Sequence, residues 1–270
     1  GGDALLMLDL GSRWAEAKAL AVFHDPATGA PRLACASGKV LVFDPVAGGD
    51  ALFVLDIGSE VTVLAVFKEP ATGAPRLACG SDDGKVRVFD PVAGGEALVV
   101  IDVGSKVLAL AVFADPATGA LRIACGCYQK VFIFDPVAGG EALVVLEGHT
   151  DWVRALTVFE DPATGGLRLA SGSRDNSVRV WDLAAGGAAL FVLEGHTSCV
   201  YALTAFADPA TGDMRLASGS RKTLRVWDAS KGGAALQVVP FDDDVNALAV
   251  RGDTSGLFVA SGKRWGELRI

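Results

Sequence analysis

Residues 139–182 read GGEALVVLEGHTDWVRALTVFEDPATGGLRLASGSRDNSVRVWD, and this stretch decides the fold. It contains four short apolar runs rich in Val, Leu and Phe, separated by turns rich in Gly, Pro and Asp. The runs are Ala142–Leu146, Val153–Phe159, Leu167–Ser171 and Ser177–Trp181. Short apolar runs bounded by turn residues are typical of β-strands rather than helices. The stretch therefore predicts four strands and no helix.

The same stretch recurs along the whole chain. A Gly-Gly pair opens each of six units, at positions 1, 48, 94, 139, 186 and 232. A turn related to Asp-Pro-Ala-Thr-Gly recurs inside the units, and an aromatic-Asp pair closes the first five. Four strands in every repeat of about 46 residues predict the blades of a β-propeller. Because a lone blade cannot bury both of its faces, we expect residues 1–270 to form a single domain.

The fourth unit carries the landmarks of a known family. Gly148-His149, the segment Leu169–Ser173, Asp175 and Trp181-Asp182 resemble the pattern of the WD-repeat (Trp-Asp repeat) β-propeller family. The resemblance is strong in the fourth and fifth units. It is weaker in the first three, where Gly-Ser replaces Gly-His and Phe replaces Trp. The family usually has seven blades, whereas this chain has six units.

We predict an all-β, six-bladed β-propeller of four-stranded antiparallel blades. The chain begins with an expected outer strand, Ala4–Leu8, and ends within an expected third strand, Glu267–Ile270. Pairing of these two strands would close the ring and remove exposed sheet edges. A truncated seven-bladed array is the alternative.

Composition limits the classes of function. A formal net charge of −8 argues against general nucleic-acid binding, which needs a basic surface. One of the longest uncharged apolar runs, Val107–Ala114, is far shorter than the roughly 18 residues of a membrane-spanning helix. Five dispersed cysteines do not resemble a disulfide framework, and no signal peptide is visible. We therefore expect a monomer in a reducing compartment, the cytoplasm or the nucleus, with no nucleic-acid or membrane partner.

His149, Ser171 and Asp175 are the residue types of a catalytic triad. The family resemblance implies instead a buried structural relay, in which the imidazole bridges the Asp and the hydroxyl and the Trp181 indole N–H lies at the far end. In the second unit the His, Ser and Trp are replaced together, by Ser59, Cys79 and Phe89. Coordinated replacement suits packing rather than catalysis, since an unsatisfied member of a buried polar set costs roughly 1–3 kcal/mol. We expect no catalytic residue.

A metal-dependent propeller hydrolase is the rival class of function. Such an enzyme needs carboxylate or imidazole ligands on the innermost strands. The expected innermost strands hold no Asp, Glu or His: they are Ala19–Phe23, Val63–Phe67, Ala109–Phe113, Ala155–Phe159, Ala202–Phe206 and Ala247–Val250. Cys35, Cys79 and Cys125 occupy one position in three successive blades, too far apart to share a zinc ion. We read them as buried small hydrophobes, and expect no enzyme, metal or cofactor.

The loops fall into two kinds. The Asp-Pro-Ala-Thr-Gly and Pro-Val-Ala-Gly-Gly turns barely change between units, whereas the other turns vary in length and chemistry. Because strands alternate in direction, each kind lies on its own face, and the varied face is the candidate binding surface. It carries aromatic, amide and basic side chains, many of them the usual anchors of protein interfaces. These residues are Trp152, Arg154, Arg174, Tyr201, Arg221, Lys222, Asn246 and Arg264.

The resemblance implies a non-catalytic scaffold that binds a peptide or protein segment. Peptide-contacting positions of the family fall at Trp152, Arg154, Arg174, Tyr201, Asn246 and Arg264. We expect an acidic or phosphorylated segment to bind through the arginines. Two alternatives stay open: an ordinary mixed surface, on which neighbouring Asp residues cancel the positive field, and an engineered or recently amplified ring with no evolved partner.

Overall fold

The structure is a computed structural model that describes residues 17–208, 211–253, 256–262 and 268–269. Every regular element within these ranges is a β-strand. The predicted all-β class and the antiparallel four-stranded sheets are therefore confirmed. In the same ranges there is no helix of the length and apolar character that crossing a bilayer demands.

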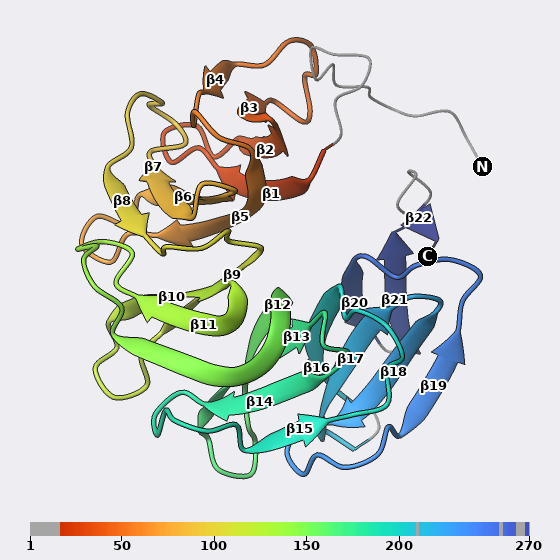
Figure 1. The fold of residues 1–270 in the computed structure, drawn as a ribbon. Coiled ribbons are helices and arrows are strands. Elements are labelled where there is room, and N and C mark those ends of the chain that lie inside the picture. Colours follow the sequence, from red (N-terminus) through yellow and green to blue (C-terminus); the bar gives the residue numbers. More distant parts are fainter. Residues whose placement is uncertain (1–16, 209–210, 254–255, 263–267, 270) are drawn as a thin grey trace. The chain divides into compact units, whose positions relative to one another are not determined.

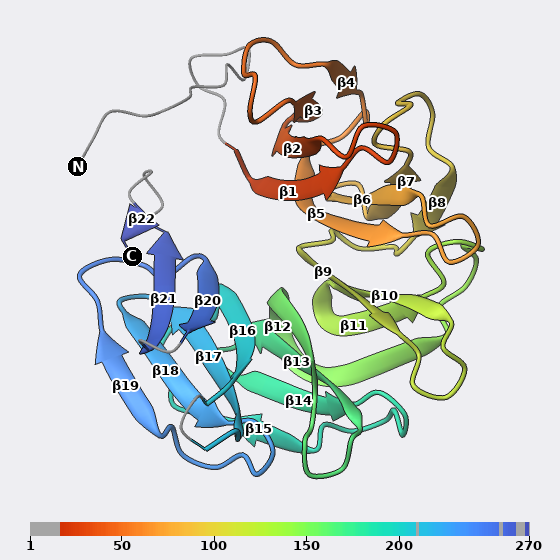
Figure 2. The same ribbon diagram turned by 180° about the vertical axis from the view of Figure 1, so that it is seen from behind.

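Three sheets contain four antiparallel strands each, in chain order. The path of the chain through these sheets can be followed in both views (Figure 1, Figure 2). The first comprises β1 (Ala19–His24), β2 (Pro31–Ser37), β3 (Lys39–Phe43) and β4 (Phe53–Leu55). The second comprises β5 (Val61–Lys68), β6 (Pro75–Ser81), β7 (Lys85–Phe89) and β8 (Val99–Asp102). The third comprises β16 (Ala202–Ala207), β17 (Met214–Ser220), β18 (Thr223–Asp228) and β19 (Gln237–Pro240).

Two sheets depart from this plan. A three-stranded sheet contains β20 (Leu248–Asp253), β21 (Gly256–Gly262) and β22 (Leu268–Arg269). A seven-stranded sheet runs in the order β15-β14-β13-β12-β11-β10-β9. Its strands are β9 (Ala109–Ala114), β10 (Leu121–Gly126), β11 (Tyr128–Phe134), β12 (Val144–Glu160), β13 (Leu167–Ser173), β14 (Val178–Asp182) and β15 (Phe191–Leu193).

The seven-stranded sheet corrects one prediction. The sequence predicts separate strands at Ala142–Leu146 and Val153–Phe159, but β12 is one continuous strand of 17 residues. Its first part pairs with β11 and its second part with β13. The linking residues stay extended because β11 and the residue before it hold them: Val153 N–H donates to Cys127 O (2.9 Å) and Gln129 Nε2 donates to Thr150 O (3.0 Å).

The uniform turns form because their Asp residues satisfy nearby backbone donors. In the first, the Asp25 carboxylate accepts the Ala27 N–H at 2.9 Å, and Gly29 closes the turn with a φ of 69°. Asp and Gly favour turns for these two reasons. A neighbouring Arg32 lies 3.5 Å from Asp25 and 3.0 Å from Asp44, so it joins the two uniform turns of the sheet. Equivalent arginines occupy the same place at Arg76, Arg122, Arg168 and Arg215.

The chain forms two compact units, each with buried aliphatic side chains. The first comprises Gly1–Val112, Leu121–Cys125 and Phe134–Leu143; the second comprises Phe113–Ala120, Gly126–Ile133 and Val144–Ile270. Within the first, the core includes Val40, Val42 and Leu77; within the second, it includes Leu193, Leu216 and Trp227. The expected outer strand Ala4–Leu8 lies outside the described residues. Blade number and ring closure therefore stay predictions.

Candidate functional site

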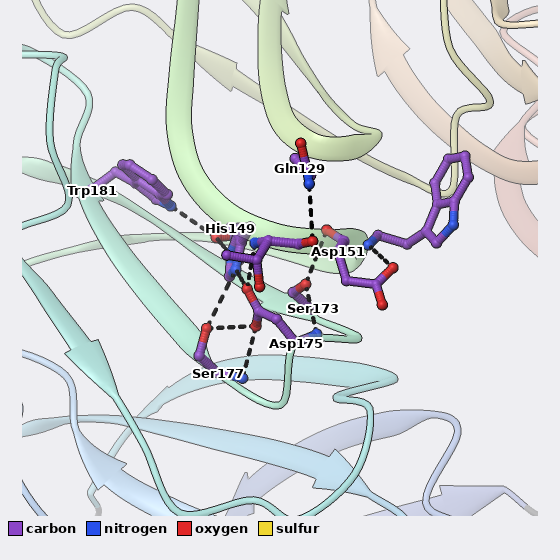
Figure 3. Close-up of polar contacts among 10 residues, drawn as sticks. Gln129, His149, Asp151, Ser173, Asp175, Ser177 and Trp181 are labelled. Carbon is purple, nitrogen blue, oxygen red and sulfur yellow. Dashed lines mark hydrogen bonds and ion pairs between the residues drawn. The ribbon is translucent and has the colours of Figure 1, made fainter.

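The four relay residues of the fourth unit form a chain of three hydrogen bonds. Figure 3 labels His149, Asp175 and Trp181 of this chain. His149 Nδ1 is 2.8 Å from Asp175 Oδ2, and His149 Nε2 is 2.7 Å from Ser171 Oγ. Trp181 Nε1 donates to the same Ser171 oxygen at 2.8 Å. The contacts connect β12, β13 and β14 through side chains that are almost entirely buried.

Sequence reasoning missed further donors to Asp175. Ser177 Oγ donates to Asp175 Oδ1 at 2.6 Å, and the Thr150 backbone N–H donates to Oδ2 at 3.0 Å. Burial raises the pKa of Asp175, but the hydrogen bonds from His149, Ser177 and Thr150 outweigh it and hold the pKa well below its usual range. The Asp-Asn-Ser spacing, which is typical of an Asx turn, is the signal that could have found Ser177.

This geometry suits stabilisation of the sheet. A nucleophilic serine must reach its substrate, whereas Ser171 is fully buried and its oxygen already lies against both the imidazole and the indole. Each of the three hydrogen bonds crosses between strands or to the turn that joins them. The arrangement can therefore fix the register of three strands.

The fifth unit contains a shorter version of the relay. His196 Nε2 lies 2.6 Å from Ser218 Oγ, which also accepts the Trp227 indole N–H at 2.7 Å. Its β17–β18 turn has no counterpart of Asp175, and Thr223 Oγ1 lies 3.4 Å from His196 Nδ1 instead. Burial, aided by the Arg225 charge, lowers the pKa of His196 to about 4. This imidazole is therefore neutral at pH 7.

In the second unit, an arginine takes the place of the imidazole. Arg87 Nη2 lies 2.6 Å from Asp83 Oδ2, and Ser81 Oγ donates to Asp83 Oδ1 at 2.6 Å. The hydrogen bond from Arg87 lowers the pKa of Asp83 to about 2. Cys79 and Phe89 occupy the equivalent serine and tryptophan positions, and both are buried. Replacement of the relay thus leaves the carboxylate paired.

The glycine before each relay histidine has a backbone conformation that favours glycine. Gly148 has a φ of +145°, and a Cβ built on it would lie 2.9 Å from Arg179 Nη1. Gly195 has a φ of +136°, with Arg225 Nη1 at 3.1 Å from the same position. Residues with a side chain rarely adopt this backbone conformation. The Gly-His pair therefore combines a backbone requirement with the relay.

Two aromatic contacts bring together candidate binding residues of the second compact unit. The Trp152 ring packs edge-on against Tyr128, with centroids 5.0 Å apart. The Arg154 guanidinium carbon lies 5.8 Å from the centre of the Tyr201 ring. Arg154 is exposed, and Tyr128 is 47% exposed. Sequence reasoning missed Tyr128 because it begins β11 at an irregularity in the pairing with β12, next to Gln129, which has a φ of 63°.

Two of the other basic candidates lie beside acidic side chains. Arg174 Nε is 3.7 Å from Asp151 Oδ2, and Arg221 Nε is 3.9 Å from Asp244 Oδ1. Lys222 is exposed, whereas Asn246 is partly buried. Arg264 lies outside the described residues. The acidic neighbours offset part of the positive charge, as the mixed-surface alternative requires.

All five cysteines are buried, and none of them forms a disulfide. Burial raises the pKa of Cys127 to about 12 and that of Cys199 to about 11, so both are thiols at pH 7. Among the described side chains, no group of three or more His, Cys, Asp or Glu residues is placed to hold a metal ion.

Comparisons with known proteins give a family and a fold. The family model WD40, described as "WD domain, G-beta repeat", matches residues 140–182 and 187–228. A search of curated proteins finds no match. Among solved structures, the chain is similar to the crystal structure of the computationally designed Ika8 protein, with 27% identity and a TM-score of 0.68. That similarity covers 97% of this chain and 72% of the designed one. The family match falls on the two repeats that contain the relays, residues 140–182 and 187–228, and is consistent with a WD-repeat family.

Proposed function

We propose that this protein is a non-catalytic interaction scaffold that binds an acidic or phosphorylated peptide segment on the face with the varied loops. WD repeats suggest a role in protein interaction, and the family is generally non-catalytic. The finer assignment, to this face and this class of partner, rests on the side chains gathered there.

One observation carries the proposal. Arg154 is exposed and lies over the Tyr201 ring, so an aromatic surface supports a guanidinium that remains accessible. Arginine binds carboxylate and phosphate through two parallel hydrogen bonds, and arginine and aromatic residues dominate the energetics of interfaces. Tyr128 and Trp152 add a second aromatic surface from β11 and β12.

We further propose that six blades close into one ring and one domain. The six units and their sheets support this proposal, since each blade needs a neighbour on both faces. A closed ring would hold the varied loops of successive blades on a common face, where one peptide could contact several of them.

Binding of a phosphopeptide library to the intact chain tests the proposed function. The Arg154→Glu variant should lose at least about tenfold in affinity for acidic or phosphorylated peptides, because it replaces an attractive charge by a repulsive one. Lys231→Glu is the matched control, since Lys231 is an exposed basic residue in a uniform turn. Equal binding by wild type and Arg154→Glu would exclude this site.

A second candidate is an engineered or amplified ring with no evolved partner. The similarity to a computationally designed protein favours it. This candidate predicts that no peptide in the library binds with an affinity that depends on Arg154, whereas the scaffold predicts a subset of peptides that do.

A further inference from the structure

Two edge strands of the first compact unit, β4 and β8, carry a repeated stripe of exposed side chains. In β4 and the residues next to it, exposed residues alternate with buried or partly buried ones. The exposed residues are Asp50, Leu52, Val54 and Asp56. Along and beside β8 the corresponding set is Glu96, Leu98, Val100 and Asp102. The four aliphatic residues are between 49% and 56% exposed. Of these residues only Val54, Val100 and Asp102 lie within β4 or β8, where residues two apart share a face. The alternation in exposure continues through the residues beside the strands, so each stripe is an aliphatic pair with a carboxylate at both ends.

Both stripes lie on sheet edges. β4 pairs only with β3, and β8 only with β7, among the strands that the structure describes (Figure 1). Neither strand contains Lys or Pro, residues by which many proteins prevent pairing at an edge. An exposed edge offers backbone N–H and C=O groups to an added strand.

We propose that β4 and β8 each bind an extended peptide segment with the pattern Lys-x-Val-x-Val-x-Lys, by addition of a strand to the sheet edge. The aliphatic residues of such a segment would cover Leu52 and Val54, or Leu98 and Val100. Its basic ends would lie opposite the carboxylates, because this spacing matches the stripe residue for residue. The site uses other residues than those of the varied face and acts alongside the proposed function.

Charge selects this partner over a second copy of the chain. In antiparallel pairing, the first residue of one strand faces the last residue of the other. Two copies of β4 would therefore place Asp50 opposite Asp56 at both ends of the pair. Like charges directly opposite one another are destabilising, whereas opposite charges are favourable. Basic ends also complement the chain's net charge of −8.

Two edge strands of the second compact unit, β15 and β19, provide an internal comparison. Near β15 the exposed positions are Ala188, Leu190, Val192 and Glu194; near β19 they are Ala234, Leu236, Val238 and Pro240. The first of these stripes keeps one carboxylate, while the second has none and carries a proline. Peptide binding should therefore protect the backbone amides of β4 and β8 from hydrogen exchange most strongly, those of β15 less and those of β19 least.

The test uses the full chain and a fluorescent peptide, Lys-Thr-Val-Thr-Val-Thr-Lys. Anisotropy should report saturable binding, and the variant Asp50→Lys/Glu96→Lys should bind about tenfold more weakly. These two carboxylates are chosen for two reasons. Asp56 already pairs with Lys39 (Nζ to Oδ2, 2.8 Å), and Asp56 and Asp102 also accept the backbone N–H groups of Gly58 and Gly104. A peptide with Glu at both ends should bind wild type at least tenfold more weakly.

Hydrogen exchange gives the location of binding. The basic peptide should slow exchange of amides within residues 53–55 and 99–101, whereas Leu52 and Leu98 already donate to Val42 O and Val88 O. Arg154→Glu should leave the affinity for this peptide unchanged. Absence of binding, equal binding to the Asp50→Lys/Glu96→Lys variant, or loss of binding in Arg154→Glu would each overturn the proposal. A dimer in sedimentation with these amides already protected would also overturn it, because a second copy would then occupy the edge.

Discussion

Asp175 is the carboxylate of the relay, and it accepts several hydrogen bonds. Its two oxygens accept from His149, Ser177 and the Thr150 N–H, and its side chain is 8% exposed. Asp175→Ala would leave buried donors without a partner, so the free energy of unfolding should fall by about 2–4 kcal/mol in urea denaturation.

Asp151→Ala is the matched control for this prediction. Asp151 pairs with Arg174 at the surface, and its side chain is 35% exposed. Such a pair contributes only about 0–1 kcal/mol. Equal losses in the two variants would show that the relay does not stabilise the blade.

The lowered pKa of His196 predicts how the free energy of unfolding depends on pH. Its pKa is about 4 when folded, against an ordinary value of 6.5, so the unfolded chain takes up the proton first as pH falls. The contribution of the neutral His196 to the free energy of unfolding is therefore fully present above pH 6.5. It declines as the pH falls towards 4 and levels off below that, and the total loss is roughly 3 kcal/mol.

Denaturation at pH 7 and pH 4.5 checks this dependence. His196→Gln removes the titrating group, so wild type should lose more stability than the variant between the two pH values. Other groups titrate in both proteins and cancel in the difference. An identical loss in both would mean that His196 takes up its proton as readily in the folded state as in the unfolded one.

At the residue scale, side-chain types with a fixed place in the repeat could be predicted, and local backbone geometry could not. The resemblance implied a set containing His149, Ser171, Asp175 and Trp181, and the structure places these four together. The Thr150 N–H leaves no mark in a sequence, because every residue except proline has one. Tyr128 begins β11, where the pairing with β12 is irregular and Gln129 has a positive φ.

At the scale of the elements, alternation and turn chemistry predicted most strands, because these signals are local. The continuity of β12 was not predictable, since Thr150 and Val153 are held by Gln129 and Cys127, which belong to the preceding unit. Tertiary hydrogen bonds thus extended a strand across a segment that reads as a turn.

Side-chain packing against β6, β13 and β17 explains a second recurrent glycine. A Cβ on Gly172 of β13 would lie 2.6 Å from Val200 Cγ1, and Gly80 and Gly219 meet Val107 and Val245 in the same way. Gly172→Ala should therefore lower the free energy of unfolding by about 2 kcal/mol through overpacking.

A double-mutant cycle tests this packing. Val200→Ala alone should cost about 2 kcal/mol, because Val200 is fully buried. In Gly172→Ala/Val200→Ala the new methyl group occupies space that the valine vacates, so the loss should be smaller than the sum by at least about 1 kcal/mol. Additive losses, measured by urea denaturation, would contradict the proposed steric relation.

At the scale of the whole molecule, the six-bladed ring makes a prediction for the start of the chain. If residues 4–8 pair as an outer strand in the closing blade, their amides should exchange hydrogen slowly, at rates comparable to those of β4 and β8. Exchange as fast as that of an unstructured peptide would contradict closure by this strand.

The most direct test of the scaffold is an affinity pulldown that compares three forms of the intact chain. Wild type and Lys231→Glu should capture the same proteins, and Arg154→Glu should lose them, because only the last variant changes the varied face. If all three forms capture the same set, or if none captures any protein, recognition through this face is contradicted.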